Sequence, residues 1–160
     1  MARALLITNP AAARTRPHAV HAILATFKSA GWTADLGETA RSGDARRLAA
    51  EGVAAGADVV AVFGGDGTTM QAASSLVGTD VHLGLIPGGT GNLLAGNLRI
   101  PTAPVRATRA LIAGRPRPFD LGRVERPDGT HYFAVACGAG YDARVMAGTP
   151  AAMKRRWKIG

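Results

Sequence analysis

The sequence of 160 residues has one cysteine, few aromatic residues and no long uncharged apolar run. Cys137 has no partner for an intrachain disulfide, and this sparing use of cysteine favours a cytoplasmic location. Phe, Trp and Tyr make up 5% of the chain, too few for base-stacking surfaces, so no nucleic-acid partner is expected. Gly, Pro and charged residues interrupt every apolar stretch before the roughly 18 residues that a membrane span needs. We therefore expect no transmembrane segment and only peripheral membrane contact.

Acidic residues are scarce relative to basic ones. The chain has 19 Lys and Arg against 11 Asp and Glu, which gives a net charge of +8. A positive surface favours anionic partners, such as the phosphates of nucleotides, nucleic acids or lipid headgroups. The length and the 47% of apolar residues suit one domain with one buried core.

Short apolar runs alternate with segments of helical periodicity over most of the chain. The run over residues 58–63 has the continuous hydrophobicity of a central parallel strand. The other predicted strands are 4–8, 32–36 and 82–86, and the predicted helices are one from Pro17 to before Gly31, one over 44–55 capped by Ser42, one over 68–77 and one over 104–113. This alternation predicts an α/β fold with an open, mostly parallel sheet in three layers. The segments 119–125 and 131–137 around a Pro-Asp-Gly turn predict an antiparallel hairpin near the C-terminus.

Two glycine-rich turns follow two of the predicted strands. Gly64-Gly65-Asp66-Gly67-Thr68 comes after strand 58–63, and Pro87-Gly88-Gly89-Thr90-Gly91-Asn92 comes after strand 82–86. Glycines let backbone N–H groups approach a phosphate, and the helix after the first turn directs its positive end to the same anion. Open α/β sheets bind ligands at the carboxyl ends of their strands, so the two turns are predicted to hold a polyphosphate between them. The alternative is a pair of ordinary strand-to-helix turns, with Asp66 as a helix cap.

The two turns and their spacing are similar to those of the catalytic domain of the diacylglycerol kinase and sphingosine kinase superfamily. Further segments that fit that family's pattern are Asn9-Pro10, Thr39, Gly43-Asp44-Ala45, Asp120-Leu121-Gly122 and Gly138-Ala139-Gly140-Tyr141-Asp142-Ala143. The resemblance implies that residues 1–160 form an ATP-binding α/β domain, with a β-rich second domain expected downstream. It also implies an ATP- and Mg²⁺-dependent kinase that transfers the γ-phosphoryl group to a lipid hydroxyl such as that of diacylglycerol. The isolated chain should be poorly active, because the general base is expected in the second domain.

The resemblance assigns roles to individual residues. Asp66 and Asp120 would be catalytic residues and metal ligands: Asp66 would position metal, water or the attacking hydroxyl, and Asp120 would join the acidic network around Mg²⁺. The residues expected to bind ATP are Asn9, Thr39, Gly64, Gly65, Gly67, Thr68, Gly88, Gly89, Thr90, Gly91 and Asn92. Taken without the resemblance, Asp120 fits equally well as a strand-end cap or an arginine partner.

Three positions depart from the family pattern. Leu93 follows Asn92 where many bacterial members have Asp, so a metal network that needs this carboxylate is not expected. The segment 11–14, Ala-Ala-Ala-Arg, replaces the usual Ser-Gly after Asn-Pro and weakens a backbone phosphate site there, although Arg14 or Arg16 can compensate by charge. Val135 stands where many members have Asn, which removes a polar group from the hairpin.

Two other functions are compatible with the same residues. An NAD-kinase-like enzyme also carries Gly-Gly-Asp-Gly-Thr, but it is not expected to have the loop 87–92. The second alternative is a basic module that binds nucleotides or nucleic acid without catalysis. The basic residues near the C-terminus are either a solvated helix face or a patch for an anionic membrane that presents the lipid substrate, and they are Arg144, Lys154, Arg155, Arg156 and Lys158, with Trp157 among them. A homodimer is an open alternative for the assembly.

Overall fold

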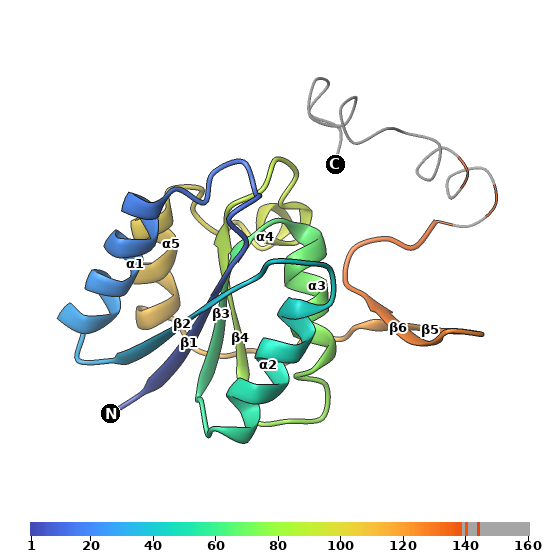
Figure 1. The fold of residues 1–160 in the computed structure, drawn as a ribbon, viewed down its shortest axis with the longest axis horizontal. Coiled ribbons are helices and arrows are strands. Elements are labelled where there is room, and N and C mark those ends of the chain that lie inside the picture. Colours follow the sequence, from blue (N-terminus) through green and yellow to red (C-terminus); the bar gives the residue numbers. More distant parts are fainter. Residues whose placement is uncertain (139, 141–143, 145–160) are drawn as a thin grey trace.

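A four-stranded parallel sheet forms the centre of the structure, a computed structural model that describes residues 1–138, 140 and 144 (Figure 1). The strands are β1 (Arg3–Thr8), β2 (Thr33–Glu38), β3 (Val59–Gly64) and β4 (His82–Pro87), in the spatial order β2-β1-β3-β4. Helices α1 (Pro17–Ser29) and α5 (Pro104–Ala113) cover one face, and α2 (Asp44–Ala54) and α3 (Asp66–Ser74) cover the other. The predicted three-layer α/β fold is therefore confirmed.

The core consists of two apolar clusters, one on each face of the sheet. Along β3, Val59, Ala61 and Phe63 pack toward α1 and α5, whereas Val60 and Val62 pack toward α2 and α3. Every residue of β3 is buried, because this strand has a neighbour on each side and helices on both faces. This burial is the physical reason for the continuous apolar run in the sequence.

A small antiparallel hairpin of β5 (Gly122–Arg126) and β6 (Gly129–Phe133) follows the sheet, and β6 lies beside α3 (Figure 1). The predicted hairpin is confirmed, but both strands are shorter than predicted. Pairing ends at Gly122 and Phe133, where the Phe133 ring lies so close to Gly122 that a Cβ there would meet ring atoms at 2.2–2.6 Å. Within the described residues, no helix is long and apolar enough to cross a membrane.

Helix boundaries differ from the sequence prediction at three places. Helix α3 runs over Asp66–Ser74 rather than 68–77, and the short helix α4 (Leu93–Asn97) was not predicted. Ser42 is not the cap of α2: the N-cap is Gly43, whose φ of 94° lies in the left-handed region that favours glycine. The Ser42 hydroxyl instead accepts a long hydrogen bond of 3.4 Å from Gln71 Nε2.

The first residue of α2 closes the loop that precedes this helix. The buried carboxylate of Asp44 accepts hydrogen bonds from the N–H groups of Ala40 and Arg41 at 2.8 and 2.9 Å. These bonds, followed by the nearby guanidinium groups of Arg47 and Arg41, hold the pKa of Asp44 below its usual value. The charged carboxylate therefore contributes stability above the unfolded-state pKa, and this contribution is lost as the pH falls through the lower folded-state pKa.

Asp44→Asn should lower the Tm at pH 7, because the amide replaces a charged acceptor of two backbone hydrogen bonds. The Tm difference from the wild type should shrink as the pH falls from about 4 toward the lower folded-state pKa, because the wild-type carboxylate becomes protonated over that interval. Thermal unfolding between pH 7 and pH 3 measures this difference. Asp35→Asn is the control, since this exposed carboxylate lies 3.8 Å from Arg3 in a weak surface pair. A Tm difference for Asp44→Asn that stays constant over the whole pH range would contradict the assignment.

Candidate functional site

The carboxyl ends of the four parallel strands bring the predicted site loops to one edge of the sheet. The N–H of Asn9 donates to the Phe63 carbonyl at 3.4 Å, and the N–H of Thr39 donates to the Thr8 carbonyl at 2.9 Å. The N–H of Gly88 donates to the Gly64 carbonyl at 2.8 Å. These bonds continue the sheet pairing one residue beyond the strands, so the loops start from fixed positions.

The two glycine turns touch each other directly. A Cβ on Gly89 would lie 2.6 Å from the Gly65 Cα, and a Cβ on Gly88 would lie 2.9 Å from the Gly64 backbone nitrogen. The cavity between this contact and α4 is about 10 Å³, the size of roughly one water probe. Gly88 and Gly89 are buried against the first turn, so the backbone fills the space between these glycines, and a polyphosphate held jointly by the two turns stays a prediction.

An open groove of about 480 Å³ lies beside the first glycine turn, between the loops that follow β1 and β2 and the start of α3. Its lining residues are Asn9, Ala11, Ala12, Thr39, Ala40, Arg41, Ser42, Ala45, Gly65, Gly67, Thr68 and Gln71. Five of them belong to the predicted ATP-binding set: Asn9, Thr39, Gly65, Gly67 and Thr68. The volume is within the range of roughly 300–1,000 Å³ typical of small-molecule sites.

The N-terminus of α3 presents unpaired backbone donors at this groove. The first hydrogen bond of the helix runs from the Thr69 N–H to the Gly65 carbonyl at 3.0 Å. The N–H groups of Asp66, Gly67 and Thr68 therefore have no backbone acceptor in the described part of the chain. Gly67 is exposed, and no atom lies within 4 Å of the position that a Cβ would take. An anion can thus reach these donors and the positive end of the helix.

Asn9 lies at the end of β1 and connects this side of the groove to α3. Its Nδ2 donates to the Thr68 hydroxyl at 3.2 Å, and its Oδ1 accepts the Ala11 N–H at 3.0 Å. The Asn9 carbonyl also accepts hydrogen bonds from the Ala12 N–H, at 2.9 Å, and from the Thr15 hydroxyl. The segment 11–14 is therefore held by local bonds even though it lacks the usual Ser-Gly.

Asp66 and Asn92 face away from the groove. Asp66 is half-buried and lines the small cavity beside α4, where its Oδ1 accepts a long hydrogen bond of 3.4 Å from the Leu94 N–H. The Asn92 side chain closes the second turn, because its Oδ1 accepts the Gly89 N–H at 2.9 Å and its Nδ2 donates to the Gly89 carbonyl at 2.8 Å. Thr90 and Gly91 are exposed at the tip of this turn.

Asp120 is exposed in the segment between α5 and β5, and it has no hydrogen bond or ion pair within the described part of the molecule. The same described residues contain no cluster of three or more His, Cys, Asp or Glu side chains that could hold a metal. Mg²⁺ commonly binds through one or two carboxylates together with substrate phosphates, and the carboxylate next to the groove, Asp66, lines the small cavity beside α4 in this structure. The predicted positions 139, 141–143 and 154–158 lie outside the described residues.

The sequence prediction missed Gln71 and Arg41 as groove residues. Gln71 lies one helical turn after Gly67, and its Oε1 accepts the Gly43 N–H at 3.0 Å, which ties α3 to the loop before α2. The four-residue spacing from Gly67 places Gln71 on the same face of the helix and could have indicated it. Arg41 lies in a loop, where no such periodicity exists.

Three comparisons with known proteins agree with this geometry. Residues 3–124 match the family described as diacylglycerol kinase catalytic domain. A diacylglycerol kinase of Mycobacterium tuberculosis is 40% identical over 119 residues, which cover 73% of this chain and 38% of that protein. A Pseudomonas putida protein named "Probable lipid kinase YegS-like" is 35% identical over 138 residues, which cover 85% of this chain and 45% of that protein. The crystal structure of a diacylglycerol kinase from Bacillus anthracis aligns with a TM-score of 0.66 at 29% identity, covering 74% of this chain and 42% of that one.

The matched region contains the whole parallel sheet, both glycine turns and every residue that lines the groove. The chain spans less than half the length of the curated relatives described above. Because the family match covers most of its residues, the chain belongs to the diacylglycerol kinase catalytic domain family.

Proposed function

We propose that this chain is the nucleotide-binding part of a lipid kinase and that the groove beside the first glycine turn holds the phosphates of ATP. The observation that carries the proposal is the open space at Gly67, where unpaired N–H groups at the start of α3 face a groove of about 480 Å³. A phosphate is the ligand that such donors suit best. Membership of the family supports phosphoryl transfer as the chemistry.

Each groove residue has a distinct part in this proposal. The N–H groups of Gly67 and Thr68 would bind phosphate oxygens, and the Thr39 hydroxyl at the groove wall would donate to the nucleotide. Asn9 would keep Thr68 in place through the hydrogen bond between their side chains. Gly88 and Gly89 would act indirectly, because their contact with the first turn fixes the position of Gly65.

The acidic residues and the metal complete the proposed site. Bound Mg²⁺ would neutralise phosphate charge. Asp66 would leave its long hydrogen bond with the Leu94 N–H and turn toward the groove, where it would be a protein ligand of the metal or would orient the attacking hydroxyl. Asp120 is a second proposed ligand. The proposed acceptor is a lipid hydroxyl such as that of diacylglycerol, reached by a cytoplasmic enzyme at the surface of an anionic membrane.

Gly67→Ala should weaken ATP binding at least about tenfold, because the new Cβ would occupy the space that a phosphate needs to reach the α3 donors. The free energy of unfolding should stay equal or rise by up to about 1 kcal/mol, since alanine favours a helix more than glycine does. Titration calorimetry with ATP and denaturant unfolding measure the two effects.

Gly89→Ala is the matched comparison for Gly67→Ala. Its Cβ would meet the Gly65 backbone at 2.6 Å, so this variant should lose about 1–3 kcal/mol of stability. Unchanged ATP affinity in a folded Gly67→Ala variant would contradict the placement of the phosphates.

Asp66→Asn should reduce lipid phosphorylation by about 100-fold or more in the protein that carries this chain, because a charge at the reacting phosphates is removed. The assay supplies radiolabelled ATP with diacylglycerol, a sphingoid base, a polyprenol and NAD, in the presence of Mg²⁺ or EDTA. We expect a labelled lipid that depends on Mg²⁺, with the Tm of the variant close to that of the wild type.

Two results would overturn the lipid-kinase proposal. Label on NAD and on no lipid would identify an NAD-kinase-like enzyme instead. Full activity of Asp66→Asn would show that this carboxylate has only the structural role indicated by its hydrogen bond to the Leu94 N–H.

A further inference from the structure

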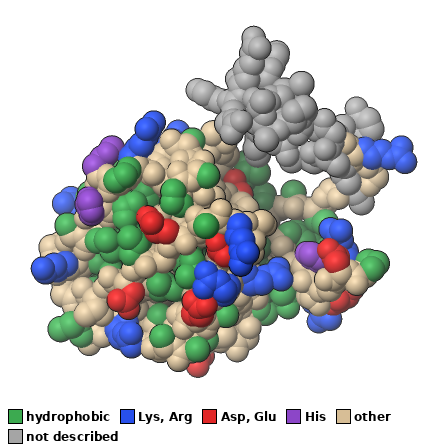
Figure 2. All heavy atoms as spheres, in the orientation of Figure 1, with side chains coloured by type: hydrophobic (Ala, Val, Ile, Leu, Met, Phe, Trp, Pro, Cys, Tyr) green, Lys and Arg blue, Asp and Glu red, His purple; other side chains and the backbone are tan. Residues whose placement is uncertain are grey.

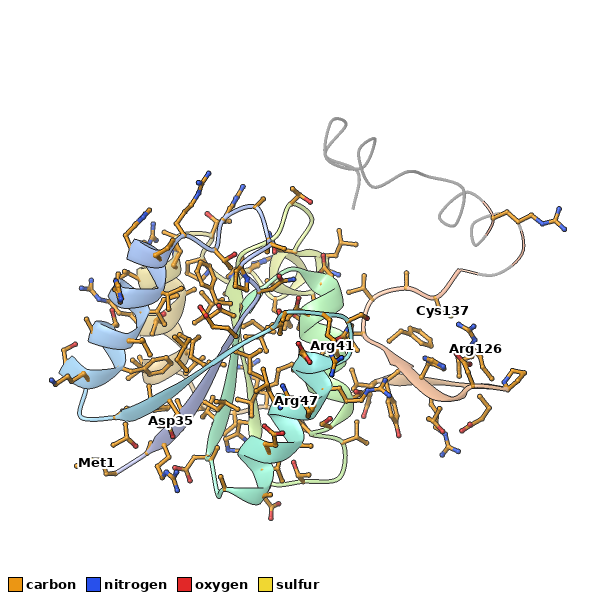
Figure 3. All side chains as sticks on the ribbon, viewed as in Figure 1. Met1, Asp35, Arg41, Arg47, Arg126 and Cys137 are labelled. Atoms are coloured by element: carbon orange, nitrogen blue, oxygen red, sulfur yellow. The ribbon has the colours of Figure 1, made fainter. Side chains whose placement is uncertain are left out.

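A loop between β2 and α2 forms the rim of the groove opposite the start of α3. The loop starts at Thr39 and ends at Gly43, and Arg41 is the basic residue among the groove-lining residues. Figure 2 shows Lys and Arg side chains gathered over α2 on the face that it draws. In Figure 3, Arg41 lies nearer than Arg47 to the carboxyl edge of the sheet.

The backbone of this rim is fixed at both ends. The Thr39 N–H is bound to the Thr8 carbonyl at 2.9 Å, and the Gly43 N–H is bound to the Gln71 side chain at 3.0 Å. Between them, the N–H groups of Ala40 and Arg41 are bound to the Asp44 carboxylate. The backbone at Arg41 is therefore already ordered, and it loses little additional conformational entropy when a ligand binds.

The Arg41 side chain, in contrast, is weakly held. It is 86% exposed, and its Nε lies 3.7 Å from Asp44 Oδ1, beyond hydrogen-bond distance. Asp44 does not depend on this contact, because two backbone N–H groups already donate to its Oδ2 and the Arg47 guanidinium lies 3.6 Å from its Oδ1. Arg41 can thus turn to another anion without leaving a buried charge unpaired.

Arg47 provides an internal comparison, because it also lies near the Asp44 carboxylate but hydrogen-bonds to another side chain. Its Nη1 donates to Glu51 Oε1 at 2.8 Å, one turn further along α2. Arg47 is absent from the residues that line the groove. The two arginines therefore share a local charge environment and differ in access to the proposed ligand.

We infer that Arg41 binds a phosphate of the nucleotide. Its guanidinium supplies a charged contact from the rim that faces the backbone donors of α3. This inference rests on the proposed function and deepens it, because it makes recognition depend on the charge of the polyphosphate as well as on the glycine turn. A guanidinium can pair with phosphate oxygens through two N–H groups. Because di- and triphosphates carry more negative charge than a monophosphate, the attraction to Arg41 favours the longer phosphate chains. Nothing in the segment 11–14 is required for this contact.

The test compares the affinities of this chain for ATP, ADP and AMP in the wild type, Arg41→Gln and Arg47→Gln at two salt concentrations. Arg41→Gln should weaken ATP binding about tenfold and AMP binding less than about threefold, because the longer phosphate chain loses more charge pairing. Arg47→Gln should keep both affinities within about twofold of the wild type. Arg41→Lys should recover part of the ATP affinity, and the wild type should lose more affinity than Arg41→Gln when salt is raised.

Different failures have different meanings in this experiment. If the wild type binds ATP and Arg41→Gln binds it equally well, the role of Arg41 is overturned and the proposed function stands. If Arg41→Gln and Arg47→Gln weaken binding equally, the effect belongs to the Asp44 cluster, and the specific contact is also overturned. If the wild type binds none of the three nucleotides, both the inference and the proposed nucleotide site fail. Equal Tm values for the variants confirm that each comparison is made between folded proteins.

Discussion

The contact between the two glycine turns is the constraint on which the binding edge depends. Gly88 and Gly89 approach the backbone of Gly64 and Gly65 so closely that a side chain at position 89 would overlap the opposite Cα. This approach lets the pairing of β3 and β4 continue past the ends of the strands, through the hydrogen bond from the Gly88 N–H to the Gly64 carbonyl. Because Gly64 and Gly65 directly precede α3, this contact also holds the start of α3 and the side of the groove that it forms.

Glycine thus serves two separate purposes in motifs that look alike in the sequence. The buried glycines 64, 88 and 89 allow backbone packing, whereas Gly67 leaves open space above unpaired N–H groups. Around that space, the side chains of Asn9 and Gln71 connect neighbouring loops to α3 through hydrogen bonds, and Arg41 is the positively charged residue on the rim. A rigid frame with one exposed set of donors can hold an anion without rearranging when the anion arrives.

The sequence was sufficient to predict the sheet, its parallel strands and the edge at which the loops meet. A continuous apolar run such as that of β3 is visible directly in the residue order. Because the strands are parallel, the loops at Asn9, Thr39 and Gly65 must lie at the same edge of the sheet. The direct contact of the two turns could not be predicted, because a glycine run fits a tight backbone contact and a phosphate site equally well. The cap of α2 was predicted as Ser42 but is Gly43, which makes no side-chain cap hydrogen bond, and the Asp44 carboxylate binds the N–H groups of the loop before the helix.

The strand order β2-β1-β3-β4 has a consequence for how the groove forms during synthesis. Asn9 is made early, but its side-chain partner Thr68 is 59 positions later, and the Arg14 N–H finds its acceptor only at Gly88. A growing chain can therefore pair β1 with β2 before the groove residues at the start of α3 have been made. All residues that line the groove lie between Asn9 and Gln71, whereas the hydrogen bond from the Gly88 N–H to the Gly64 carbonyl needs residues that are made later, so the groove residues exist before the turn that packs against them.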